Sequence, residues 1–194
     1  QDPYFIDFSG ATALMWAAED GHLDVVEFLL DNGADVYFWS QTFIPTALLR
    51  AAVNGRTEVV RSLLDHGADV EQSVDGKTAL FFAAREGDED TGRLLLDYGA
   101  DVHAKQREVI LGPWRPKGQE KLLYVSSILM QAAQEGNYAV MHMLLDKGAK
   151  VNEVDSCGVS PLMFAVYRGH TEVARLLLNE GAAPNIKAFK RKDF

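Results

Sequence analysis

Residues 46–70 read T-A-L-L-R-A-A-V-N-G-R-T-E-V-V-R-S-L-L-D-H-G-A-D-V, and their pattern decides the fold. A threonine opens the segment, a glycine follows nine residues later, and a Gly-Ala step follows after another twelve. The opening hydroxyl recurs at Thr12, Thr46, Thr78, Ser127 and Ser160, the first glycine at Gly21, Gly55, Gly87, Gly136 and Gly169, and the second at Gly33, Gly67, Gly99, Gly148 and Gly181. Five occurrences at fixed offsets indicate an internal repeat, and such a period decides the architecture.

Each repeat predicts two short helices. The opening hydroxyl can accept hydrogen bonds from free backbone N–H groups, which is typical of a helix N-cap. The first glycine ends this helix because glycine adopts the left-handed conformation at little cost. The second helix carries two adjacent apolar rows, as in V-V-x-x-L-L at residues 59–64, and suits packing between neighbours on both sides. Since one such pair cannot bury its apolar face alone, we expect an all-α solenoid of stacked helix-turn-helix units.

At these residues the chain resembles the ankyrin repeat family, whose unit of about 33 residues carries T-P-L-H-x-A and then L-L-x-x-G-A-D-V-N. The resemblance covers nearly the whole chain as a single array, with units at about 7–40, 41–73, 74–104, 122–154 and 155–187. It implies short β-hairpin fingers between the units. The family's histidine is replaced in all five units, so we expect apolar packing in its place. The replacements are Met15, Leu49, Phe81, Met130 and Met163.

The third unit and the two ends depart from the pattern. Thr91 and Gly92 stand where the second helix of the third unit should be apolar, and a helical glycine costs about 0.5–1 kcal/mol relative to alanine. We therefore expect this helix to be the softest. Neither end has the polar outer face of a terminal repeat, which favours further repeats or another domain beyond residues 1–194.

An insertion at about residues 105–121 interrupts the repeat. The intervals between opening residues are 34, 32, 49 and 33, so about 16 extra residues fall between the third and fourth units. The sequence predicts a longer finger, with strands at 108–111 and 121–125 and a Pro- and Gly-rich turn that presents Trp114. Residues 105–121 carry five basic and two acidic residues, a local charge of +3. A recognition arm and an insertion without a partner are both open interpretations.

The first finger is rich in aromatic residues. It contains Tyr37, Phe38, Trp39 and Phe43, and exposed aromatic residues are enriched at binding hot spots. Trp39 is predicted to contact a partner. Phe43 is interpreted as covering the helix below it.

Composition and motifs argue against catalysis, cofactor binding and nucleic-acid binding. A net charge of −9 disfavours phosphate recognition, and no apolar run reaches the roughly 18 residues that span a membrane. Cys157 is the only cysteine, and the five histidines lack ligand spacing, so no metal site is expected. No nucleotide-binding glycine motif or nucleophile motif occurs. The basic residues at 187–192 are interpreted as a solvated loop rather than a nuclear signal.

The resemblance implies a non-catalytic scaffold that binds a protein or peptide along its fingers and first helices. Residues 1–49 carry eight acids and no lysine or arginine, which favours a basic or amphipathic partner segment. The alternative is a regulatory or substrate-targeting module of a larger multidomain enzyme. We expect a monomer in the cytoplasm, with the nucleus as the other compartment. The predicted contact residues are Phe8, Ser9, Ala11, Glu19, Asp20, Trp39, Pro45, Val53, Asn54, Val74, Asp75, Lys77, Arg85, Glu86, Trp114, Tyr124, Ser126, Gln134, Glu135, Ser156, Cys157, Val159, Tyr167 and Arg168.

Overall fold

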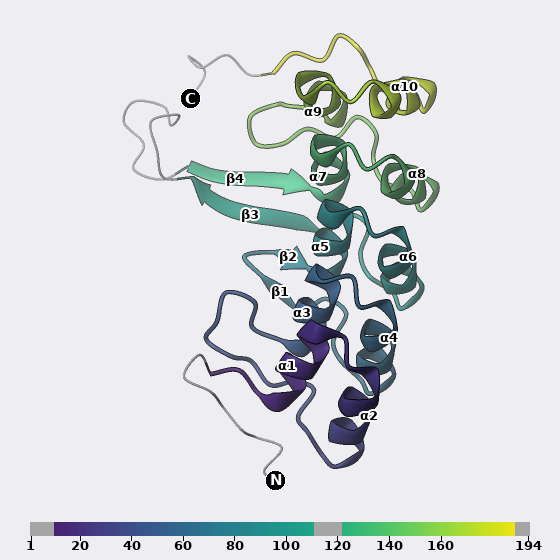
Figure 1. The fold of residues 1–194 in the computed structure, drawn as a ribbon. Coiled ribbons are helices and arrows are strands. Elements are labelled where there is room, and N and C mark those ends of the chain that lie inside the picture. Colours follow the sequence, from purple (N-terminus) through teal and green to yellow (C-terminus); the bar gives the residue numbers. More distant parts are fainter. Residues whose placement is uncertain (1–9, 111–121, 189–194) are drawn as a thin grey trace. The chain divides into compact units, whose positions relative to one another are not determined.

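The structure, a computed structural model, describes residues 10–110 and 122–188 (Figure 1). It consists of two compact units. The first comprises residues 1–74 and 78–101, and the second comprises residues 75–77 and 102–194. Residues 75–77, the turn of one short hairpin, thus belong to the second unit, and the chain passes to that unit again after Asp101.

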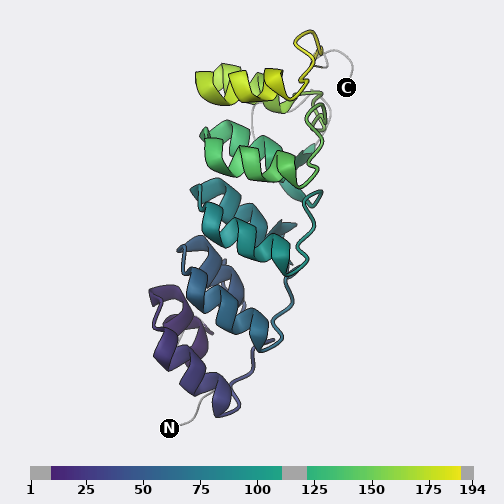
Figure 2. The ribbon, with the colours of Figure 1, turned by 90° about the vertical axis from the view of Figure 1, so that its right-hand side faces the viewer.

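The first unit contains three helix pairs. Its helices are α1 (Ala13–Asp20), α2 (Leu23–Asp31), α3 (Ala47–Val53), α4 (Thr57–Asp65), α5 (Ala79–Glu86) and α6 (Glu89–Asp97). The inner helices α1, α3 and α5 pack in series, and the outer helices α2, α4 and α6 form a second row (Figures 1 and 2). Strands β1 (Ser73–Val74) and β2 (Lys77–Thr78) form the hairpin in which the chain changes unit.

The second unit contains two helix pairs and a longer hairpin. Its elements are β3 (Lys105–Ile110), β4 (Leu122–Ser127), α7 (Ile128–Glu135), α8 (Tyr138–Asp146), α9 (Pro161–Arg168) and α10 (Thr171–Asn179). Helix α7 packs on α9, and α8 packs on α10 (Figure 2). The predicted all-α architecture of stacked helix pairs, with small hairpins and one enlarged finger, is confirmed.

The opening hydroxyl residues cap the inner helices as predicted. Thr12 Oγ1 accepts a hydrogen bond from Met15 N at 3.3 Å, and Ser160 Oγ accepts one from Met163 N at 3.3 Å. The same bond starts α3, α5 and α7. At the other end of α1, Gly21 has φ 84° and donates its N–H to Ala17 O, so the predicted left-handed stop is present.

The residues that replace the family's histidine pack in the core. Met15, Leu49, Phe81 and Met130 are all buried, and Met163 is half-buried. The prediction of apolar packing is therefore confirmed at the first four places and only in part at Met163. Burying each of the four buried side chains contributes about 1.5–3 kcal/mol.

The strands of the enlarged finger extend further than predicted. The sequence predicted strands at 108–111 and 121–125, whereas β3 begins at Lys105 and β4 continues to Ser127, with which Lys105 pairs. Turns on either side explain the extra length. Arg107 N donates to Asp75 O at 2.9 Å on the outer edge of β3, and Ser156 N donates to Val125 O at 3.1 Å on that of β4. Arg107 and Val125 are partners in the hairpin, so its base is held from both sides.

The two rows of apolar residues on the outer helices are not equally buried. In α4 all four members of the rows are buried, as predicted for a helix with neighbours on both sides. In α2 the prediction is wrong for Val25, which is 42% exposed, and in α10 it is wrong for Leu178. Among the described residues, α2 and α10 each pack against another outer helix on one side only.

Candidate partner-binding surface

A cluster around Arg50 fixes the inner helices of the first unit. Arg50 is only 8% exposed, and its Nη1 lies 2.5 Å from Glu19 Oε2. Its Nε donates to Ile44 O at 3.1 Å, and its Nη2 donates to Thr42 Oγ1 at 3.3 Å. The guanidinium carbon lies 5.7 Å from the ring centre of Trp16, within cation–π range. The cluster joins α1, α3 and the first finger.

Internal ion pairs neutralise part of the negative charge of the predicted contact surface. Glu19 is paired with Arg50, and Glu86 Oε1 lies 2.6 Å from Arg85 Nη2. The Arg85 guanidinium also lies 5.2 Å from the ring centre of Phe82. Asp20 is exposed at the end of α1. Other exposed acids of the first repeat lie on or after the outer helix. They are Asp24, Glu27, Asp31 and Asp35.

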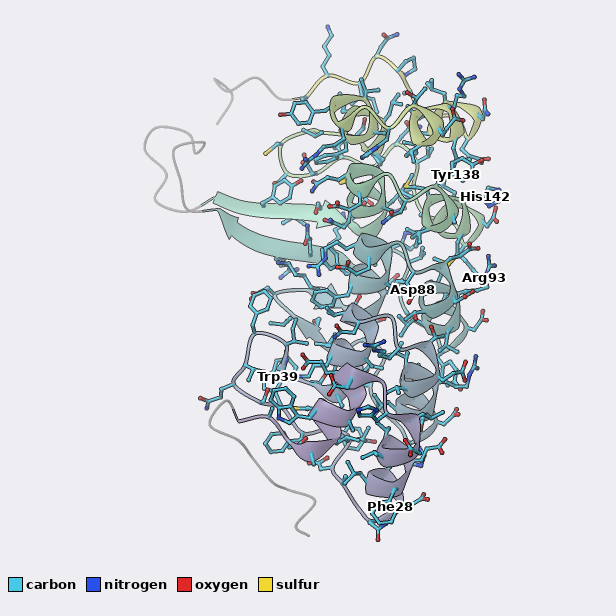
Figure 3. The ribbon with its side chains drawn as sticks, viewed as in Figure 1. Phe28, Trp39, Asp88, Arg93, Tyr138 and His142 are labelled. Carbon is cyan, nitrogen blue, oxygen red and sulfur yellow. The ribbon has the colours of Figure 1, made fainter. Side chains whose placement is uncertain are left out.

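The first finger exposes aromatic side chains on a hydrogen-bonded loop. Trp39 is 50% exposed and lies on the finger side of the first unit (Figure 3), and Tyr37 is also exposed. Phe43 is 75% exposed, so its interpretation as a cover for the helix is wrong. Ser40 N donates to Pro45 O at 2.8 Å, and Ser40 Oγ lies 2.6 Å from Thr42 Oγ1. These hydrogen bonds hold a loop on which Tyr37, Trp39 and Phe43 are exposed and Phe38 is half-buried.

A polar cluster lies next to the enlarged finger in the second unit. Asp155 is buried, and its Oδ1 accepts hydrogen bonds from the backbone N of Cys157 and of Val159, each at 2.8 Å. Burial and then the Asp155 carboxylate raise the pKa of Tyr124. Burial, again followed by Asp155, raises the pKa of the Cys157 thiol. Both groups stay protonated at neutral pH, which suits recognition by hydrogen bonding rather than nucleophilic chemistry.

The structure distributes the predicted contact residues over several environments. Phe8, Ser9 and Trp114 lie outside the described residues. Three others, Ala11, Pro45 and Ser126, are buried, so their side chains are not available to a partner. Ser126 Oγ accepts a hydrogen bond from Gln106 Nε2 at 2.6 Å, which satisfies the buried hydroxyl. The exposed set is Asp20, Trp39, Asn54, Asp75, Glu86, Glu135, Tyr167 and Arg168, and the half-buried set is Glu19, Val53, Val74, Lys77, Arg85, Tyr124, Gln134, Ser156, Cys157 and Val159.

The histidines take structural roles where their contacts are described. His66 Nδ1 lies 2.8 Å from Ser62 O, and His142 Nδ1 lies 2.9 Å from Asp146 Oδ2. Within residues 10–110 and 122–188, no group of three or more His, Cys, Asp or Glu side chains could hold a metal ion. In the same part of the chain, every helix is too short or too polar to span a bilayer.

Comparison with known proteins places repeats along most of the chain. Models described as an ankyrin repeat, as three copies of the repeat and as many copies match residues 9–39, 40–106 and 129–178, respectively. The chain is 36% identical over 87 residues to human oxysterol-binding protein-related protein 1. This matched segment covers 44% of this chain and 9% of that protein.

Two further relatives match shorter segments. Rat ankyrin repeat and SAM domain-containing protein 6 is 39% identical over 61 residues, which is 31% of this chain and 7% of the relative. Mouse 2-5A-dependent ribonuclease is 37% identical over 68 residues, 34% of this chain and 9% of the relative. The chain thus matches less than a tenth of the length of each of these three relatives.

Proposed function

The chain belongs to the ankyrin repeat family, and from that premise we propose that its fingers and inner helices bind a partner protein or peptide. Ankyrin repeats generally serve as non-catalytic protein-interaction modules. The observation that carries the proposal is the outward display of Tyr37, Trp39 and Phe43 on a loop held by its own hydrogen bonds. Rigid aromatic residues of this kind provide large contact area at a low cost in conformational entropy.

The proposed partner is a basic or amphipathic segment that binds at the first repeats. Residues 1–49 carry a formal charge of −8, and opposite charge speeds the encounter of two molecules. The pairing of Glu19 with Arg50 removes one acid from this attraction. Asp20 and the exposed acids of α2 supply the negative charge that attracts the partner, while the aromatic residues of the first finger supply the apolar contacts.

The organisation of the chain is part of the proposal. We take residues 1–194 as one array of five repeats with an insertion at about 105–121, in the cytoplasm or, alternatively, the nucleus. The remaining candidate contacts come from the corresponding places of the other repeats. They are Asp20, Asn54, Asp75, Glu86, Glu135, Tyr167 and Arg168, with the half-buried set described above.

Substitution of Trp39 tests the proposal. Proteins captured on the immobilised chain are quantified for the wild type, for Trp39→Ala, and for Tyr138→Ala, which alters an exposed aromatic residue on outer helix α8 (Figure 3). We expect Trp39→Ala to weaken capture of the specific partner by about 2 kcal/mol, roughly thirty-fold in Kd, because a hot-spot contact is lost.

Salt provides the second arm of this test. Raising the ionic strength from about 0.05 to 0.5 M should weaken binding, since it screens the exposed acids. Tyr138→Ala should bind as the wild type does. Equal capture by wild type and Trp39→Ala, with no effect of salt, would show that the partner does not bind at the first finger.

A second candidate function is the regulation or targeting of an enzyme within a larger protein. The observation that favours it is the match to a short segment of mouse 2-5A-dependent ribonuclease. A catalytic domain encoded next to residues 1–194 would favour this function over an independent scaffold.

A further inference from the structure

The first finger, residues 37–45, lacks the turn residues that fix another finger of this chain. In the finger before α9, Asp155 Oδ1 accepts hydrogen bonds from the backbone N of Cys157 and of Val159, each at 2.8 Å. Asp155 N in turn donates to Val159 O at 3.0 Å, and Gly158 reverses the chain with φ 76°. An aspartate and a left-handed glycine thus hold that finger with bonds inside the loop itself.

Neither of these two features is present in the first finger. Ser40 N donates to Pro45 O at 2.8 Å, which is the same closing bond, so Ser40 takes the place of the aspartate. Its hydroxyl accepts only a long bond from Thr42 N at 3.4 Å, and Pro45 has no N–H to donate. Ile44 stands at the place of the turn glycine, and its backbone is not left-handed. The loop's own residues therefore hold the first finger less firmly.

Arg50, on α3, supplies the missing support. Its Nε donates to Ile44 O at 3.1 Å, and its Nη2 donates to Thr42 Oγ1 at 3.3 Å. The Thr42 hydroxyl gives its own proton to Ile44 O at 2.8 Å, so Ser40 Oγ, 2.6 Å away, is the donor of the bond between the two hydroxyls. These loop groups form one hydrogen-bonded network around the guanidinium.

The guanidinium is fixed from its other side by the first helix pair. Its Nη1 lies 2.5 Å from Glu19 Oε2, and its central carbon lies 5.7 Å from the ring centre of Trp16. Arg50 is only 8% exposed, so water competes little for these contacts. Because a guanidinium presents its N–H groups in a rigid, planar fork, holding it from α1 sets the position of the loop groups that it bonds.

The other repeats place no arginine here. The residue at the place of Arg50 is aromatic wherever the preceding finger has a left-handed glycine, and it is Gln131 after the β3–β4 hairpin. The aromatic residues are Trp16, Phe82 and Phe164, and the glycines are Gly10, Gly76 and Gly158. The arginine therefore accompanies the finger whose own turn residues are missing.

The network around Arg50 lies next to the exposed aromatic residues. Thr42 and Ile44 are the chain neighbours of Phe43, and Ser40 directly follows Trp39 (Figure 3). Phe43 is 75% exposed and Trp39 is 50% exposed. Fixing the backbone on both sides of Phe43 and directly after Trp39 limits the directions in which the two rings can point.

We propose that Arg50 is a positioning residue of the partner-binding surface, which keeps Trp39 and Phe43 in place for the basic or amphipathic segment. This inference rests on the proposed function. Since so little of Arg50 is exposed, it acts through the loop rather than by contact with the partner. A loop that is ordered before binding loses less conformational entropy when the partner binds, so a loosened first finger binds more weakly.

Hydrogen exchange tests whether Arg50 holds the loop. Arg50→Lys keeps a positive charge beside Glu19, but a lysine ammonium lacks the fork that reaches Ile44 O and Thr42 Oγ1 together. Mass spectrometry of the full chain should show about ten-fold faster exchange of the Ser40 N–H, because a charge-assisted hydrogen bond that orders the loop is lost. Exchange in α5 of the same protein is the reference for unfolding of the whole unit and should change far less.

Two further variants separate the loop from the joint between the helix pairs. Arg56→Lys is the matched control, because Arg56 Nε donates to Glu19 O at 3.2 Å across the same joint, and exchange of the loop should stay as in the wild type. Thr42→Val removes the hydroxyl that Arg50 and Ser40 both contact, and leaves the charges of Arg50 and Glu19 paired. It should speed exchange of the loop as Arg50→Lys does.

The consequence for binding is measured with a synthetic amphipathic peptide of lysine and leucine, by fluorescence anisotropy. Arg50→Lys and Thr42→Val should raise its Kd about five-fold or more, and Arg56→Lys should leave the Kd unchanged. Trp39→Ala reports on the proposed function itself. If the peptide does not bind, or binds Trp39→Ala as it binds the wild type, the first finger is not the partner site and the role of Arg50 falls with it.

A failure confined to Arg50 has a different signature. If Trp39→Ala weakens binding while Arg50→Lys matches Arg56→Lys in loop exchange or in Kd, the first finger binds without help from Arg50, and the proposal is overturned. Exchange that becomes equally fast in the loop and in α5 would also overturn it, since the unit as a whole would then be unfolding.

Discussion

Arg50 joins two helix pairs and the first finger, although nothing in the sequence around it predicts this role. It occupies a place where other repeats have Trp16, Phe82 or Gln131, so the repeat pattern gives no sign of an ion pair there. Its partners lie 31, 6 and 8 residues away in the chain, at Glu19, Ile44 and Thr42. Only the stacking of two helix pairs brings these groups together, which is why the cluster could not be predicted.

Removal of the Glu19 carboxylate should destabilise the first unit. Glu19→Ala leaves the buried Arg50 guanidinium without its charged partner, and we expect a loss of about 1–3 kcal/mol in the free energy of unfolding. Urea denaturation followed by circular dichroism measures the change. Glu86→Ala is the control, because its partner Arg85 is partly exposed, unlike Arg50, and the pair should contribute less than about 1 kcal/mol. Equal effects of the two substitutions would contradict this account of Arg50.

The Cys157 thiol should react slowly. Burial and Asp155 raise its pKa above the usual value, so the folded chain holds the thiol proton to higher pH than the unfolded chain does. The pH profile of alkylation by iodoacetamide should therefore have a higher midpoint in the folded protein than in urea. By linkage, this group's contribution to stability is full below the unfolded pKa and falls as pH rises through the folded pKa. A folded profile that coincides with the profile in urea would refute the effect.

At the scale of elements, the helices were predictable and the finger was only partly so. Hydroxyl caps and terminating glycines act within a few residues, so the sequence carries their signal locally, as the bonds at Thr12 and Gly21 show. The enlarged hairpin was predicted in kind but not in extent. Its extra pairs depend on Asp75 and Ser156, which are distant in sequence from the strands that they hold.

The turn at Asp75–Gly76 should be intolerant of a side chain. Gly76 has φ 74°, and an added Cβ would lie 2.6 Å from Lys105 O and 3.2 Å from Arg107 N. Gly76→Ala should therefore displace β3 and cost about 2–4 kcal/mol in stability, measured by thermal or urea unfolding. Gly99→Ala is a matched control, since Gly99 has φ 91° with open space around its Cβ position and so reports backbone strain alone. If Gly76→Ala were as stable as Gly99→Ala, the close contact between residue 76 and β3 would have no effect on stability, contrary to this prediction.

At the scale of the whole molecule, fixed landmarks predicted the stack of helix pairs, while exposure could not be predicted. Val25 and Val59 occupy the same place in their repeats, yet one is 42% exposed and the other is buried. The difference comes from what lies beside each helix, which no local pattern records. Within one predicted contact surface, likewise, Pro45 is buried and Trp39 is exposed.

The hairpin turn that changes unit has a consequence for limited proteolysis. Residues 75–77 belong to the second unit although the segments on either side of them belong to the first, and Asp75 O accepts the Arg107 N–H. Cleavage after Asp101 would therefore not yield two self-sufficient fragments. The C-terminal fragment would lose Asp75, which pairs with the edge of β3. The N-terminal fragment would keep residues 75–77 without the strand that they contact.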